Sequence, residues 1–347
     1  MRKFLIALLT LCFTLGSFVC LTGCGEVNLT YSKMFFNSEV NIVVKGYSNK
    51  ISCEEEITST LTFLDNTFSL SKTGSLANRF NNLTLEDEPI TLTEEENQVF
   101  STIYQLNTLH EKFNITIYPL VELWGFNAGA SGKTEVPEDS EIQSALELVG
   151  TNKILYNQQN KTLTKTENGV KIDFGGVLKG YAVDVITNIL KDNGYTDGYI
   201  SIGGSSISIL ETTSKLSIVH PENVNDNVLQ IENHLIKNKK LSTSGTYRKF
   251  YEIAGVKYSH VIDVSTGKPI DTGFTSITLI ADNGAKLDAL STALLTLTKE
   301  ELISYFNQNL SNYTIFAIYN KNGEKKVLTN LENDFTLLDS SYQIEKI

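Results

Sequence analysis

Cysteine is scarce in this chain, with four among 347 residues, and three of them precede residue 25. Beyond that point Cys53 stands alone, which excludes a disulfide framework for the rest of the chain. A hydrophobic core must therefore stabilise the fold, and a chain of this length can build one. Basic residues are also few, 29 against 40 acidic ones, for a net charge of -11. This balance argues against nucleic acid or an anionic lipid surface as the main partner.

The N-terminus carries a long apolar run. Arg2 and Lys3 precede "FLIALLTLCFTLGSFVC", and "LTGC" follows it, ending at Cys24. This order is typical of a secretory signal with a lipobox. We expect residues 1–23 to be a signal peptide and 24–30 a short tether from a lipidated Cys24. The protein would then be extracytoplasmic, lipid-anchored to the outer face of the bacterial cytoplasmic membrane. A signal peptide with a chance cysteine is the alternative.

Helical and strand-like patterns do not alternate regularly along the chain. Thr93 and Glu96 indicate a capping box that opens a helix of about five turns. Further helices are expected over 177–192 and from about 284 to 297, whereas the second half is rich in strands. The sequence therefore predicts an α+β fold of mostly antiparallel sheets with packed helices, in a single domain over 31–340.

The segment "KIDFGGVLKGYAVD" concentrates polar groups where a predicted strand gives way to a helix. Gly175 and Gly176 would let the backbone approach a ligand, and the helix N-terminus attracts anions. Lys179 adds a positive charge for a phosphate, and Asp173 could accept hydrogen bonds from a ribose or a base. Neither the P-loop nor the G-x-G-x-x-G spacing is present. On spacing alone, a tight turn with a salt bridge is an equally good interpretation.

Asp288 and Thr292 lie four residues apart in the late helical segment, so they should project from one face. A carboxylate and a hydroxyl are hard oxygen ligands that suit Mg²⁺ better than Zn²⁺. The alternative is that Thr292 bonds the carbonyl four residues earlier while Asp288 faces solvent.

Histidine is rare, and His260 is the one within a motif, three residues before Asp263. A histidine facing a carboxylate can act as a base. The serines of "STSG", residues 242–245, raise a Ser-His-Asp hydrolase, but the G-x-S-x-G elbow is missing, which weighs against that class. The other histidines are assigned to the surface or to a turn: His110, His234 and His220.

Five motifs occur in order: "DFGGVLKGYAVD", "SIGGSS", "STSGTYRKFY", "HVIDVSTGKP" and "LDALSTAL". Together they resemble the FAD:protein FMN transferase (ApbE) family in its lipoprotein form, and "LDNTFSLSKTGSLANRFN" and "FNITIYPLVELWGF" resemble its N-terminal signatures. The resemblance extends from about residue 30 to about residue 335. It implies the ApbE, T-fold-like architecture.

The resemblance also implies an activity. Such enzymes split the pyrophosphate of FAD with Mg²⁺ and attach FMN by a phosphoester bond to a threonine or serine of a partner flavoprotein, releasing AMP. Phosphoryl transfer of this kind depends on positioning and charge neutralisation. The implied acceptor is a flavoprotein domain of a membrane electron-transport system with a D-x-x-[ST]-G-[AS]-T motif. "DVSTGK" at Asp263–Lys268 is this chain's nearest match and lacks the small residue and the threonine, so self-modification is not expected.

Motif matching assigns roles to individual residues. The implied metal ligands are the carbonyl of Gly176 and the side chains of Asp288 and Thr292. The implied catalytic residues are His260, which would receive the acceptor's proton, Asp288 and Lys179. The residues expected to contact the cofactor are Asp173, Lys179, Ile262, Phe113, Asn114 and His260, with Trp124 as a further candidate.

Three positions depart from the family's pattern. Phe36-Asn37-Ser38 stands for its usual "MGT", Ser71 replaces a frequent aromatic residue, and Val264 replaces a proline. The first two put flavin or adenine affinity in question. Two other functions remain open: an FAD pyrophosphatase that uses water as the acceptor, and a non-catalytic flavin- or solute-binding lipoprotein.

Overall fold

A nine-stranded sheet forms the centre of the computed structural model, which describes residues 27–46, 50–127, 133–212 and 215–347. Neighbouring strands are antiparallel, except for the parallel last pair. In sheet order the strands are β1 (Val27–Phe35), β2 (Ser38–Gly46), β6 (Tyr195–Ile202), β7 (Ser206–Ile209), β10 (Lys240–Gly245), β15 (Phe274–Ala281), β16 (Thr314–Lys321), β17 (Glu324–Thr329) and β19 (Gln343–Lys346). The predicted α+β class with mostly antiparallel sheets is confirmed. β1 begins within the predicted tether of residues 24–30.

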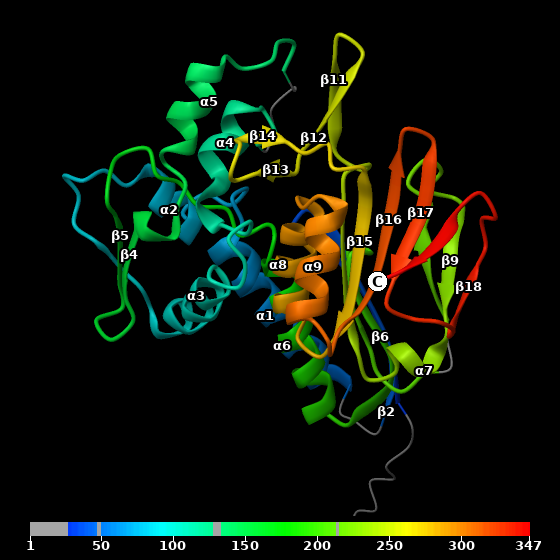
Figure 1. Cartoon of the computed structure of the whole chain (residues 1–347). Coiled ribbons are helices and arrows are strands. Elements are labelled where there is room, and N and C mark those ends of the chain that lie inside the picture. The colour runs from blue at the N-terminus through cyan, green and yellow to red at the C-terminus, as the bar shows by residue number, and fades with distance from the viewer. Residues whose placement is uncertain (1–26, 47–49, 128–132, 213–214) are drawn as a thin grey trace, which may run out of the picture.

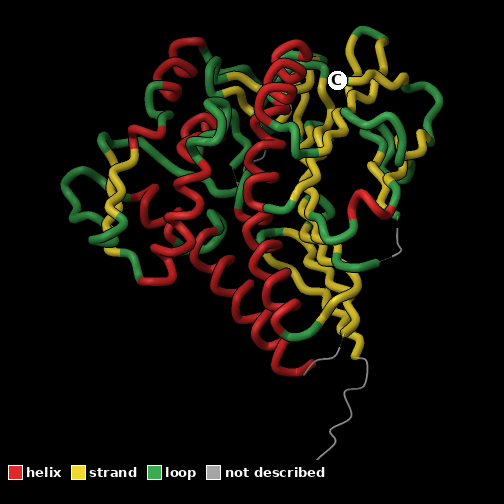
Figure 2. The backbone as a smooth tube through the Cα atoms, turned by 60° about the horizontal axis from the view of Figure 1, so that its bottom comes forward, coloured by secondary structure: helices red, strands yellow, loops and turns green. Residues whose placement is uncertain are grey.

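Helices cover one face of this sheet, as Figures 1 and 2 show. They are α1 (Lys50–Phe68), α6 (Leu178–Asp192), α8 (Gly284–Leu295) and α9 (Lys299–Asn309). Alternation along β15 explains the packing, because Ile277 and Leu279 join the core beneath α8 and α9 while Ile280 points to the opposite face. α6 and α8 lie against each other, and each also contacts the central strands.

A small sheet packs on the opposite face of the central one. Its members are β18 (Phe335–Leu337), β9 (Asn227–Ile231) and β8 (Leu216–Val219), and α7 (Asn233–Ile236) follows β9. Val228 and Ile231 pack against Ile280, Phe316 and Val327 of the large sheet. With both faces covered, the middle strands are buried and hold any polar side chain that they carry in a fixed position.

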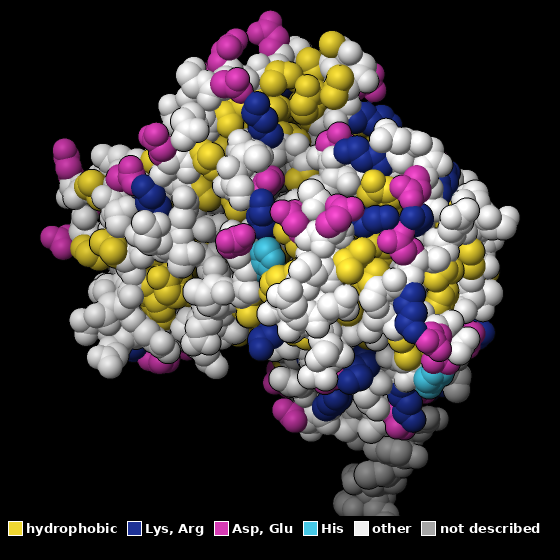
Figure 3. Space-filling model, in the orientation of Figure 1, with side chains coloured by type: hydrophobic (Ala, Val, Ile, Leu, Met, Phe, Trp, Pro, Cys, Tyr) yellow, Lys and Arg dark blue, Asp and Glu magenta, His cyan; other side chains and the backbone are white. Residues whose placement is uncertain are grey.

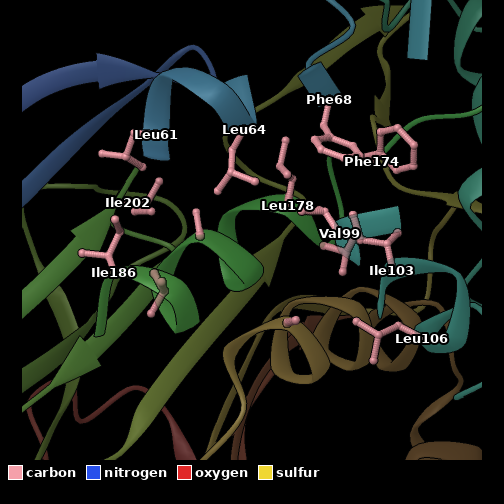
Figure 4. Packing of buried hydrophobic residues seen from close by; sticks show 14 of the residues in the cluster. Leu61, Leu64, Phe68, Val99, Ile103, Leu106, Phe174, Leu178, Ile186 and Ile202 are labelled. Carbon is pink, nitrogen blue, oxygen red and sulfur yellow. The ribbon is translucent and has the colours of Figure 1, made fainter. Parts of the chain in front are cut away.

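The remaining elements gather beside the edge of the helical layer. The helical ones are α2 (Leu76–Asn82), α3 (Glu94–Leu106), η1 (Ile115–Ile117), α4 (Tyr118–Leu123), α5 (Asp139–Leu146) and η2 (Thr151–Lys153). The strands are β3 (Ile90–Thr91), β5 (Thr162–Lys165) and β4 (Ile154–Asn157) in one sheet, the hairpin β11 (Phe250–Ile253) and β12 (Val256–Ser259), and the pair β13 (Ile262–Asp263) and β14 (Lys268–Pro269). Figure 4 shows how Phe68, Val99, Ile103 and Phe174 join this part to the α1–α6 core.

Two local predictions need correction. α3 has the predicted capping box but ends at Leu106, short of five turns, because the Asn107 side chain accepts from the backbone of Ile115 at 2.8 Å. Val170–Phe174 is not in a strand of the structure. The Ile172 N–H donates to Oδ1 of Asn81 at 2.7 Å, so a side chain takes the place of a ladder partner. The predicted helices near 177–192 and 284–297 are confirmed as α6 and α8.

Within the described residues, no helix is long and apolar enough to cross a membrane. The predicted signal peptide and Cys24 lie outside those residues. Cys53, for which the sequence predicts no disulfide partner, is a free thiol; it is also buried, and burial raises its pKa to about 11. On the face drawn in Figure 3, acidic and basic side chains are interspersed.

Candidate active site

A cleft of about 450 Å³ opens where the N-terminus of α6, the helix α8 and strand β10 meet the segments that lead into η1 and β13. Apart from the further candidate Trp124, every residue predicted to contact cofactor or metal is in its lining: Phe113, Asn114, Asp173, Gly176, Lys179, His260, Ile262, Asp288 and Thr292. A neighbouring hollow of about 430 Å³ shares Asp173, Gly175 and Lys179 with it. The two hollows adjoin at these shared residues and form one extended cleft.

Asp288 is held firmly although it lies at the wall of the cleft. Its side chain is buried, and the residue is only 3% exposed. Oδ2 accepts from the backbone N–H of Gly180 at 3.0 Å, and Oδ1 accepts from the hydroxyl of Ser242 at 3.0 Å. Lys179 Nζ lies 3.9 Å from Oδ2. A carboxylate with these donors is fixed in direction while each oxygen keeps a further lone pair.

Thr292 lies one turn beyond Asp288 on α8. Its Oγ1 donates to the carbonyl of Asp288, four residues earlier, at 3.0 Å, which is the first half of the alternative given for this pair. The second half is wrong, because Asp288 is buried and does not face solvent. Ser244 Oγ lies 2.9 Å from the Thr292 hydroxyl. A Cβ placed on Gly176 would lie 3.7 Å from Thr292 Oγ1 and 3.1 Å from the Phe113 ring. Because Gly176 has no side chain, its backbone can lie close to Thr292, which with Asp288 forms the α8 pair.

These groups fit a divalent cation of the magnesium type. The candidate donors are a carboxylate, a hydroxyl and a backbone carbonyl, all hard oxygens. The described residues contain no cluster of three or more His, Cys, Asp or Glu side chains that could hold a metal. A zinc site of that composition is therefore not found in this part of the chain, whereas Mg²⁺ typically uses one or two carboxylates and completes its shell with water and phosphates.

The glycine pair forms a tight turn before α6. Oδ1 of Asp173 accepts from the Gly175 N–H at 2.7 Å, and Lys179 Nζ donates to the Gly175 carbonyl at 3.1 Å. Burial raises the pKa of Asp173, opposed by its bond from Gly175 and by the nearby Lys249 and Lys179. The segment is therefore a tight turn, and the same turn presents Lys179 to the cleft, where it could meet a phosphate. The two interpretations of the sequence do not exclude each other.

His260 is the titratable base of the cleft. Burial, together with the positive charges of Lys249 and Lys179, lowers the pKa of His260 to about 4, although its bond to the Lys249 carbonyl acts in the opposite direction. Nδ1 lies 3.0 Å from that carbonyl oxygen. A carbonyl can only accept, so Nδ1 carries the hydrogen and Nε2 keeps a free lone pair. The ring is a neutral acceptor at pH 7.

Three sequence expectations around the site are wrong. Asp263 does not face His260 but pairs with Lys112 Nζ at 2.9 Å. Trp124 is buried rather than part of the cleft lining, and its Nε1 donates to the Gly267 carbonyl at 2.8 Å. His110 is buried rather than on the surface, with its ring 4.4 Å from that of Tyr305.

Sequence reasoning missed several lining or supporting residues. Ser242 and Ser244 were considered only as nucleophiles, whereas they support the α8 pair. Their alternate spacing on a strand was the available signal, because it sends both side chains to one face. Arg248 and Lys249 also line the cleft, Arg248 bonding the Gly203 carbonyl at 3.1 Å. Both lie in the "STSGTYRKFY" motif, where two adjacent basic residues were the available signal.

Comparison with known proteins identifies the family of this chain. A model of the ApbE family matches residues 36–316, most of the chain. The chain belongs to the ApbE family. An FAD:protein FMN transferase from Vibrio cholerae is 28% identical over 306 residues, covering 86% of this chain and 89% of that protein. One from Escherichia coli K12 is 29% identical over 276 residues, covering 74% and 75%.

Solved ApbE structures show the same fold. The flavin transferase ApbE from Vibrio cholerae superimposes with a TM-score of 0.75 at 25% identity, covering 88% of this chain and 97% of that one. The ApbE protein from Thermotoga maritima gives a TM-score of 0.73 at 27% identity, covering 84% and 94%.

The departures from the ApbE pattern lie at the edge of the cleft. Phe36 and Asn37 form the β1–β2 turn with φ values of 55° and 54°, and the Phe36 N–H donates to Asp65 at 3.1 Å. Asn tolerates this left-handed region better than most residues, so Asn37 can replace a glycine there. Phe36 and Ser71 line the neighbouring hollow, and Val264 lines the cleft.

Proposed function

We propose that this protein is an extracytoplasmic, Mg²⁺-dependent FAD:protein FMN transferase that modifies a threonine or serine of a partner flavoprotein. The observation that carries the proposal is the convergence of Asp288, Thr292 and Lys179 with an uncharged His260 in one extended cleft. The relatives' shared activity supports it. A nucleotide pyrophosphate needs positive charge and hard oxygen ligands together, and the cleft supplies both.

The chain's own residues would perform four tasks. Lys179 binds phosphate oxygens, and the glycine turn lets the backbone approach them. Asp173 and Ile262 line the path of the nucleotide. Nε2 of His260 accepts the proton of the acceptor hydroxyl, while the Lys249 carbonyl holds Nδ1–H and thus the ring orientation. The Gly180 N–H and the Ser242 hydroxyl hold the Asp288 carboxylate in place at the cleft wall.

The proposed step balances as a displacement at phosphorus. The acceptor oxygen forms a bond to the phosphorus of the FMN half of FAD. The bond between this phosphorus and the bridging oxygen of the pyrophosphate breaks, and AMP leaves with the bridging oxygen. His260 takes the hydroxyl proton and later returns it to solvent. Mg²⁺ held by Asp288, Thr292 and the Gly176 carbonyl would supply positive charge for the pyrophosphate oxygens.

The location and partner complete the proposal. A lipidated Cys24 would anchor the enzyme to the outer face of the cytoplasmic membrane, where an acceptor domain of a membrane electron-transport system would be accessible. The acceptor is expected to carry a D-x-x-[ST]-G-[AS]-T motif.

The test is the stoichiometry of the two products. Residues 25–347 are incubated with FAD, Mg²⁺ and a small acceptor domain, and the acceptor mass and AMP are measured together. One FMN gained for each AMP released supports the transferase. AMP with no acceptor modified, across several acceptor domains, supports the pyrophosphatase, and intact FAD retained by the protein supports a flavin carrier.

A further inference from the structure

The backbones of α6 and α8 touch at one pair of glycines. A Cβ on Gly180 would lie 2.2 Å from the carbonyl oxygen of Gly284, and a Cβ on Gly284 would lie 2.6 Å from that of Gly180. Neither position can hold a side chain without moving backbone. Gly180 and Gly284 therefore define where along its length each helix contacts the other.

One turn beyond each glycine stands an aspartate that bonds the other helix. Oδ2 of Asp288 accepts from the Gly180 N–H at 3.0 Å. In return, Oδ1 of Asp184 accepts from the Gly284 N–H at 2.8 Å, and Oδ2 accepts from the Ala285 N–H at 2.9 Å. All three N–H groups belong to first turns of helices, which have no partner within their own helix.

Lys240 fixes the carboxylate of Asp184 in turn. The two side chains form an ion pair, and both are largely buried, 14% and 17% exposed. Lys240 belongs to β10, the strand that also carries Ser242 and Ser244. Asp184 thus ties α8 to α6 and to the same strand whose serines contact Asp288 and Thr292.

We propose that Asp184 is a positioning residue for the metal site, because it fixes the position of α8 along α6. Asp184 itself is not among the residues that line the cleft. Its bonds to Gly284 and Ala285 hold the first turn of α8, and Asp288 and Thr292 follow on the next two turns. Lys179 and the Gly176 carbonyl are carried by α6 and its preceding turn. The inference rests on the proposed metal site. Asp184 would control the distance between the side chains of Asp288 and Thr292 on α8 and the Gly176 carbonyl before α6.

The experiment measures Mn²⁺ binding to the chain in the absence of FAD, by electron paramagnetic resonance of the free ion. Asp184→Ala should raise the Kd for Mn²⁺ at least tenfold, and Asp184→Asn, which keeps one acceptor oxygen, should raise it less. FAD binding without metal, followed by flavin fluorescence, should change less than twofold in both. The matched control is Thr298→Ala, which removes the N-cap hydroxyl of α9; Thr298 is not among the residues that line the cleft, and its loss should leave Mn²⁺ binding unchanged.

The outcomes separate the two claims. Loss of Mn²⁺ binding in Asp288→Asn with parent-like binding in both Asp184 variants overturns the positioning role and leaves the metal site standing. Parent-like binding in Asp288→Asn, or no binding by the parent, overturns the metal assignment and the inference with it. If circular dichroism shows that Asp184→Ala is unfolded, Asp184→Asn decides alone, with an unchanged Kd contradicting the proposal.

Discussion

The hydroxyl of Ser242 donates a hydrogen bond to Oδ1 of Asp288 across 3.0 Å, from a strand of the central sheet to the helix above it. The Ser242 residue is fully buried. With the Gly180 N–H on the other oxygen, each carboxylate oxygen has a protein donor, and the two donors fix the orientation of the group. The sheet thus orients a side chain of the helical layer toward the cleft.

Replacement of Ser242 by Ala should weaken metal binding without abolishing activity. A buried hydrogen bond to a charged group contributes about 1.5 kcal/mol or more, so the Mg²⁺ concentration for half-maximal activity should rise about tenfold. Thr187→Ala is the matched control, because it removes a buried hydroxyl that donates to the Val183 carbonyl within α6 and does not line the cleft. Equal Mg²⁺ requirements in both variants would contradict the role of Ser242.

The pH profile of kcat/KM for FAD should fall only below about pH 4. Burial and two lysines lower the pKa of His260 to about 4, so the neutral base persists well below the usual 6.5 of histidine. In the complex the pyrophosphate charge should raise this pKa, placing the acid limb of kcat above that of kcat/KM. An acid limb of kcat/KM near 6.5 would refute the assignment.

Removing His260 should also change stability with pH. The unfolded chain takes up the proton near pH 6.5 and the folded chain only near 4, so this residue costs the fold stability as pH falls between those values. His260→Ala should lower kcat roughly 10²-fold or more while making thermal stability less sensitive to acid in that window. His234→Ala, at an exposed site, is the control and should do neither.

Lys179→Met should lower kcat/KM for FAD about 10- to 100-fold. The ammonium group lies at the cleft wall beside the glycine turn, and a charged hydrogen bond to phosphate contributes about 1.5–3 kcal/mol. Steady-state AMP release measures the change. Lys286→Met on α8, a lysine outside the cleft lining, is the control. An unchanged kcat/KM in Lys179→Met would remove Lys179 from phosphate binding.

Replacing Cys24 by Ala tests the proposed anchor. Detergent phase partitioning of whole-cell extracts should recover the parent chain in the detergent phase and the variant in the aqueous phase, because the lipid supplies the membrane affinity. Cys53→Ala is the control, as this thiol is buried in the core. Detergent-phase recovery of Cys24→Ala equal to that of the parent would contradict lipidation at this position.

The sequence predicted the parts of the site that depend on local order. Asp288 and Thr292 share a face because they are four apart in a helix, and the glycine pair with Lys179 occupies one turn. Contacts between residues that lie far apart in the chain could not be predicted from the local sequence. Ser242 lies 46 residues from Asp288, and Lys112 lies 151 residues from the Asp263 that it pairs with.

The same limit explains why the strand predicted just before the glycine pair is absent at Val170–Phe174. The residues of this segment are of strand-forming types, but the Ile172 N–H donates to the side-chain amide of Asn81, 91 residues earlier. The Asp173 N–H donates to the Ile115 carbonyl. Tertiary contacts of this kind override local preference. The fold class was predictable because it depends on the order of strand-rich and helical segments rather than on any single pairing.

The most direct test compares the parent and Asp288→Asn for FMN attachment to the acceptor domain, followed by mass spectrometry with FAD and Mg²⁺ present. The variant preserves the side-chain shape while removing the charge, and circular dichroism checks its fold. We expect one FMN per acceptor with the parent and a rate at least roughly 10²-fold lower with the variant. Attachment by Asp288→Asn at the parent's rate would contradict the catalytic role of Asp288.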